Sequence, residues 1–99
     1  IALLKQYLEE DPDDAFSKYA LALEYIKMSN DGEAFKLMDN LFINQPGYLP
    51  NYYHFGKLLE RMGKMNQAME IYSIGIDKAR NMNDIHTLNE LKGALDNLT

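Results

Sequence analysis

The sequence predicts an all-α protein, an α-α superhelix of tandem helical hairpins with about six helices. Three observations predict this class. Apolar residues recur at intervals of three and four along the chain, the spacing of one helix face. Long alternations of apolar and polar residues are absent and β-branched residues are scarce, so strands are not expected. Similar residues also recur at an offset of 34 positions, a period typical of helical-hairpin repeats.

The first two helices lie on either side of Pro12. Leu4, Tyr7 and Leu8 fall on one face of an opening helix, which ends at the proline because proline lacks the N–H that a helix interior needs. Asp13 or Asp14 is expected to cap the second helix, since a carboxylate satisfies early backbone N–H groups. The predicted buried stripe of that helix contains Leu21, Ala22, Tyr25 and Met28.

The third and fourth helices have clear start signals. Asn30 followed by Glu33 resembles a capping box and begins the third helix. Its predicted buried face contains Ala34, Phe35, Met38, Leu41 and Phe42. Pro46 and Gly47 form a turn, and Pro50 suits the first turn of the fourth helix, where its missing N–H does no harm.

Two more helices complete the chain. The fifth is expected from about Met65 to Arg80 and is predicted to continue a little further, because Arg80 stands 34 residues after Pro46, where a proline would have ended it. Asp84 is the predicted cap of the last helix. The amphipathic stripe of that helix contains Ile85, Leu88, Leu91, Leu95 and Leu98.

The repeat itself rests on identical pairs 34 residues apart, which are Pro12/Pro46, Tyr19/Tyr53, Met28/Met62 and Ala34/Ala68. The second unit has the motif Tyr52, Phe55-Gly56, Leu59, Gly63, Ala68, Tyr72 and Gly75-Ile76. The first has Leu21-Ala22, Tyr25, Ala34, Met38, Phe42 and Pro46. This pattern resembles the tetratricopeptide repeat. Small residues are expected where paired helices approach most closely. Lys18 departs from the family pattern, since a large aromatic residue is usual at its position.

The resemblance implies one domain over residues 1–99. Residues 1–12 would be the second helix of a half repeat, 15–48 and 49–82 two repeats, and 84–98 a closing helix. Proteins of this family commonly bind peptides or helices of a partner protein on the concave face, which the first helix of each repeat lines. The residues at groove-facing positions are Phe16, Tyr19, Leu23, Lys27, Tyr53, Lys57 and Arg61.

Two roles are expected within this set. Tyr19 and Tyr53 share a repeat position and are candidate anchors, because aromatic residues dominate binding hot spots. Lys27, Lys57 and Arg61 are candidates to receive a carboxylate or a phosphorylated residue. The alternatives are that the rings pack against neighbouring helices, and that the cations form ordinary surface ion pairs with residues such as Glu24 and Glu60.

Charge and composition exclude several classes of partner and of chemical site. The net charge is −5, and residues 1–40 contain nine acidic residues against four lysines, which disfavours nucleic acid and anionic membranes and favours a basic partner. Without cysteine there are no disulfides or thiolate metal sites. His54 and His86 lie in different predicted helices without a metal-ligand spacing, so no enzyme, cofactor or metal is expected.

A second copy of the chain is the alternative partner. Apolar surface is expected on the first helix, from Ile1, Leu4, Tyr7 and Leu8, so the chain would form a homo-oligomer or one end of a longer array. No apolar run approaches the roughly 20 residues that span a bilayer. The chain opens with Ile1 and not with methionine, so an upstream segment is expected, and the expected location is cytoplasmic.

Overall fold

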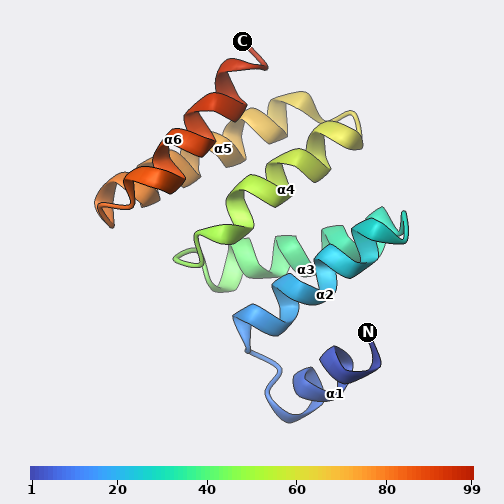
Figure 1. Cartoon of the computed structure of the whole chain (residues 1–99). Coiled ribbons are helices and arrows are strands. Elements are labelled where there is room, and N and C mark those ends of the chain that lie inside the picture. The colour runs from blue at the N-terminus through green and yellow to red at the C-terminus, as the bar shows by residue number, and fades with distance from the viewer. The chain divides into compact units, whose positions relative to one another are not determined.

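Six α-helices and no strand make up the computed structural model, which describes all residues from Ile1 to Thr99 (Figure 1). The helices are α1 (Ala2–Glu10), α2 (Ala15–Lys27), α3 (Asp31–Asn44), α4 (Pro50–Arg61), α5 (Met65–Asn81) and α6 (Ile85–Asp96). The predicted all-α fold of helical hairpins is confirmed. None of the six helices is sufficiently long and apolar to traverse a lipid bilayer.

Helix starts follow the predicted caps at α3 and α6. The side chain of Asn30 accepts a hydrogen bond from the backbone N–H of Glu33 at 3.5 Å. Asp84 accepts two bonds from Thr87, one from the backbone N–H at 3.1 Å and one from the hydroxyl at 2.8 Å. These bonds lower the pKa of Asp84, because they favour its charged form.

The start of α2 differs from the expectation. Asp14 is the residue that precedes the helix, but its carboxylate accepts no capping bond from a backbone N–H. It accepts instead from the hydroxyl of Ser17, at 2.5 Å. Ser17 is 1 % exposed, so its hydroxyl needs a partner within the protein, and the carboxylate meets that need.

The two hairpins reverse at equivalent residues. Ser29 after α2 has φ of 58° and Gly63 after α4 has φ of 78°, and these two residues are 34 positions apart. Both lie in the left-handed region, which glycine enters without steric cost and which few other residues adopt. The α5 helix continues past Arg80 to Asn81, as the missing proline predicts.

The chain forms two compact units, residues 1–46 and residues 47–99. In the first unit α2 packs along α3, and α1 contacts α2. The core of this unit is made by Leu21, Ala22, Ala34, Met38 and Leu41, all of them buried. No residue of α1 is buried, so this helix rests on the hairpin without entering its core.

In the second unit α4 packs along α5, and α6 covers α5 and also contacts α4. Two glycines bring the helices together. A Cβ added to Gly56 would lie 2.1 Å from the ring of Tyr72, and one added to Gly75 would lie 2.7 Å from the Cβ of Tyr52 and 2.9 Å from the side chain of Leu91. Any larger residue at either glycine would push the helices apart.

Two residues of the predicted apolar stripes are exposed, one from the predicted buried stripe of α2 and one from the amphipathic stripe of α6. Met28 follows the last turn of α2 and is 60 % exposed, and Ile85 is the first residue of α6 and is also 60 % exposed. Both positions have the correct helical phase. They lie at helix ends, beyond the stretch along which a partner helix packs. Leu91 and Ala94, nearer the middle of α6, are buried.

Candidate functional site

The seven predicted binding residues fall into two sets, one on each repeat's first helix. On α2, Phe16 is 62 % exposed, Lys27 is exposed, and Tyr19 and Leu23 are partly buried. Their spacing of three, four and four places them along one side of the helix. The structure therefore provides a continuous partly apolar face on α2, ending in a cation.

The second set, on α4, comprises Tyr53, Lys57 and Arg61, each one turn after the last. Tyr53 and Lys57 are partly buried and Arg61 is exposed. The ammonium nitrogen of Lys57 lies 5.5 Å from the centre of the Tyr53 ring. The ring of His54 meets the same tyrosine edge-on, with the ring centres 5.4 Å apart. These contacts hold the tyrosine between a cation and a second ring.

Glu60 connects this face to the core of the second unit. Its Oε2 lies 3.6 Å from the ammonium nitrogen of Lys57 and accepts a hydrogen bond from the hydroxyl of Tyr72 on α5. The Tyr72 side chain is fully buried. Burial and the Glu60 carboxylate together raise the pKa of Tyr72 far above its usual value, since both disfavour the tyrosinate. Glu60 is thus fixed in place by two helices.

The lysines in the predicted site have carboxylate neighbours. Lys27 pairs with Glu24 at 3.3 Å, and Lys57 pairs with Glu60 at 3.6 Å. These are the surface ion pairs that the sequence offered as the alternative role for the cations. The Lys27–Glu24 pair is exposed, and exposed pairs contribute about 0–1 kcal/mol, so a stronger anionic partner can displace Glu24 at little cost.

His54 is partly buried beside Tyr53. Burial lowers its pKa, and the carboxylate of Glu90 opposes that effect. The lowered pKa keeps the imidazole neutral near pH 7, where it acts as an aromatic neighbour of Tyr53. No group of three or more histidine, aspartate or glutamate side chains converges to hold a metal ion.

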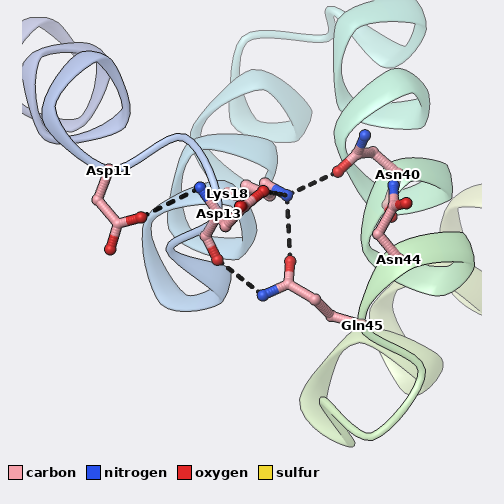
Figure 2. A network of polar contacts seen from close by, with 6 residues as sticks. All are labelled: Asp11, Asp13, Lys18, Asn40, Asn44 and Gln45. Atoms are coloured by element: carbon pink, nitrogen blue, oxygen red, sulfur yellow. Dashed lines mark hydrogen bonds and ion pairs between the residues drawn. The ribbon is translucent and has the colours of Figure 1, made fainter.

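A buried cation lies outside the predicted set. Lys18 on α2 is 6 % exposed, and Figure 2 shows its ammonium group directed toward α3. It donates to Asn40 Oδ1 at 2.7 Å and to Gln45 Oε1 at 3.1 Å, and lies 3.9 Å from Asp13 Oδ1. Gln45 in turn donates to the backbone carbonyl of Asp13 at 2.7 Å. This network ties the segment between α1 and α2 to the end of α3.

The internal repeat explains why Lys18 is tolerated there. Its counterpart 34 residues later is Tyr52, whose ring rests on Gly75. The counterpart of Gly75 in the first unit is the buried Leu41, so the first unit lacks the glycine on which the ring of Tyr52 rests in the second. A flexible lysine can pass such a side chain and place its charge among polar partners. The sequence showed the exchange at Lys18 but not the partners that accompany it.

Comparison with known proteins adds two solved structures. A crystal structure of a tetratricopeptide repeat domain protein from Salinibacter ruber is 37 % identical, covers 87 % of this chain and 96 % of its own, and has a TM-score of 0.83. A solution NMR structure of a tetratricopeptide repeat domain protein from the same organism is 39 % identical, covers 89 % of each chain, and has a TM-score of 0.85. Neither a scan of protein-family models nor a search of curated proteins found a match.

Because the sequences are 37 % and 39 % identical over almost the whole chain, the similarity shows a common family and not only a common fold. Domains of this kind are protein-interaction repeat modules and are typically non-catalytic scaffolds. The two hairpins, the 34-residue period and the small residues at the helix crossings agree with that assignment. The chain therefore belongs to the tetratricopeptide repeat family.

Proposed function

We propose that residues 1–99 act as one interaction module that docks a peptide or helix of a partner protein. The docking face would be the one that is concave in this family, lined by the first helices of the repeats at 15–48 and 49–82. Residues 1–12 would then be the second helix of a half repeat, and 84–98 a closing helix. The proposed binding residues are Phe16, Tyr19, Leu23, Lys27, Tyr53, Lys57 and Arg61.

The arrangement around Tyr53 is the observation that supports this proposal most strongly. A tyrosine held between the ammonium of Lys57 and the ring of His54 loses little conformational freedom when a partner binds. It presents both an apolar ring and a hydroxyl, which suits a hot-spot anchor. The proposed role of Tyr19, at the same repeat position, is that of the second anchor.

The cations would orient the bound segment. Arg61 lies one turn beyond Lys57 and is exposed, so its guanidinium can pair with two oxygens of a carboxylate or phosphate. Lys57 would exchange its contact with Glu60 for a contact with the partner. Lys27 would act in the same way at the end of α2, where it now pairs with Glu24.

The Tyr19→Ala, Tyr53→Ala double variant tests the proposal. In affinity capture from a native lysate, we expect the wild-type chain to retain a partner protein that the double variant loses. Once the partner is identified, the variant is expected to bind it at least about 30-fold more weakly, since one hot-spot residue contributes about 2 kcal/mol. Circular dichroism must first show that the variant remains helical.

A surface control removes two exposed apolar side chains that do not belong to the proposed docking face. Met28→Ala together with Met82→Ala changes residues that are 60 % and 57 % exposed in the turns after α2 and α5. This control is expected to retain the partner at wild-type level. Equal retention by all three proteins would place binding on another surface and contradict the proposal.

Self-association is the second candidate function, and α1 supports it. Leu3 and Tyr7 are 57 % and 45 % exposed on a helix without a single buried residue, an apolar surface that a second copy would cover. If copies associate through α1, the mass measured by light scattering rises with concentration, and Leu3→Lys with Tyr7→Lys restores the monomer mass. A monomer mass at all concentrations would dismiss this candidate.

A further inference from the structure

A groove of about 540 Å³ lies between α1, α2 and α3, entirely within the first unit. Its apolar lining is contributed by five residues, Leu8, Pro12, Leu21, Tyr25 and Leu37. None of the seven residues proposed above lines it. On α2 the groove uses Leu21 and Tyr25, whereas the proposed docking face uses Leu23. Residues two apart lie on nearly opposite sides of a helix, so these are different surfaces.

The apolar lining is only partly covered. Leu21 is 4 % exposed, but Leu8, Tyr25 and Leu37 retain some exposure to solvent. A volume of this size is typical of sites that accommodate a ligand side chain or a small molecule. The groove is thus suited to an aliphatic side chain that packs against two leucines and the tyrosine ring.

The polar lining does not select an anion. Lys18 directs its N–H groups to Asn40 and Gln45 and faces Asp13, so the protein itself supplies the partners of this charge. The other cation, Lys36, pairs with Glu33 at 3.3 Å. An incoming carboxylate would have to displace acceptors that are already in place.

The lining of the groove has two carboxylates, Asp13 and Glu33, against two lysines, but the chain next to it is strongly acidic. The segment from Glu9 to Asp14 contains five carboxylates and no cation, and it includes the groove residues Pro12 and Asp13. Asp11 is exposed, and the side chain of Asp13 is 93 % exposed. All nine acidic residues of the first 40 lie in this unit, against four lysines. The field at the groove therefore attracts cations.

We infer that this groove binds a basic peptide segment of a partner protein, distinct from the docking face proposed above. An aliphatic side chain of the peptide packs against Leu8, Tyr25 and Leu37. Lysine or arginine residues beside it pair with the carboxylates of Asp11 and Asp13. A second copy of the chain fits poorly, because its first unit carries the same excess of negative charge and its second unit has equal numbers of acidic and basic residues.

The test uses the full chain and two synthetic peptides of equal length, one of leucine and lysine and one with glutamate in place of lysine. In an NMR titration of the labelled protein, the lysine peptide is expected to shift the amide signals of Leu8, Tyr25 and Leu37 in a saturable manner. The glutamate peptide is expected to shift none of them. Fluorescence anisotropy of the labelled peptides gives the affinities.

Charge variants then separate specific binding from general attraction. Asp11→Asn with Asp13→Asn is expected to weaken binding of the lysine peptide about fivefold, since two exposed ion pairs are lost. Asparagine retains the side-chain oxygen of Asp11 that accepts from the backbone N–H of Asp13. Asp13→Asn removes a carboxylate 3.9 Å from the ammonium of Lys18, which keeps its bonds to Asn40 and Gln45, and circular dichroism checks that the variant remains helical. The matched control, Glu70→Gln with Asp96→Asn, removes the same charge from exposed residues of the second unit and is expected to bind as the wild type does.

Several results would overturn the inference. One is that the control variant loses as much affinity for the lysine peptide as the Asp11, Asp13 variant does. Another is that the glutamate peptide binds as tightly as the lysine peptide. The third is that the amide signals shifted by the lysine peptide are confined to α4 or spread over the whole chain. If the molecular mass rises with protein concentration, and the amide signals of the groove residues shift with it in the absence of peptide, a second copy of the chain occupies the groove instead. Tyr53→Ala is expected to leave binding of the lysine peptide unchanged, so failure of the proposed docking face and failure of this groove are distinguishable.

Discussion

Replacing Gly56 with alanine is expected to lower the free energy of unfolding by about 3 kcal/mol. The added methyl group would lie 2.1 Å from Cε1 and 2.5 Å from Cζ of Tyr72. The ring cannot withdraw, because it is fully buried and its hydroxyl is bonded to Glu60. The clash outweighs the gain of about 1 kcal/mol that alanine offers over glycine within a helix.

Urea unfolding followed by circular dichroism measures this loss, with Gly93→Ala as the matched control. Gly93 is also within a helix, α6, but nothing lies within 4 Å of a Cβ placed there. That variant is expected to gain about 0.5–1 kcal/mol. If Gly56→Ala loses no stability, the two helices can move apart at this point and the close contact is not rigid.

Raising the pH above 10 is expected to destabilise the protein through Tyr72, by about 1.4 kcal/mol for each further pH unit. The pKa of Tyr72 is raised in the folded protein, mainly because the ring is buried and also because Glu60 is near. The unfolded chain releases this proton near pH 10, whereas the folded protein retains it. The stabilising contribution is therefore complete below pH 10 and is lost as the pH rises toward the folded-state value.

Tyr72→Phe isolates this contribution from the other groups that titrate at high pH. The variant loses a hydrogen bond, so at pH 7 it is expected to be about 1–2 kcal/mol less stable than the wild type. The difference should fall above pH 10, vanish at about pH 11 and then reverse, so that Tyr72→Phe is the more stable protein by pH 12. Tyr52 also has a pKa raised by burial, but it is present in both proteins and does not affect the comparison. Parallel stability curves throughout this range would refute the assignment to Tyr72.

The sequence predicts helices well here because their signals are local. Asn30 and Asp84 cap the helices that follow them, and Arg80 allows α5 to continue. Burial was harder to predict at helix ends. Met28 and Ile85 have the correct phase but no helix lies over them, and helical periodicity contains no information about where a neighbouring helix stops.

In the candidate site, contacts within one helix could be predicted from the sequence, but contacts between helices could not. The contact of Tyr53 with Lys57 follows from a spacing of four within one helix. The bond between Tyr72 and Glu60 joins two helices, and the bond between Lys18 and Gln45 joins residues 27 positions apart. Such pairs depend on how the helices are packed. The repeat comparison identified Lys18 as unusual without revealing its partners.

One repeat has a glycine where the other has an alanine, and this difference helps the chain to avoid a misfolded pairing of its helices. Tandem repeats with identical cores could pair the first helix of one repeat with the second helix of the other. Here α4 has Gly56 under Tyr72, whereas the equivalent residue of α2 is Ala22. If α2 took the place of α4 beside α5, the methyl group of Ala22 would clash with the ring of Tyr72, as the methyl group of Gly56→Ala would. This steric mismatch penalises the swapped hairpin and favours pairing of each helix with its neighbour in the sequence.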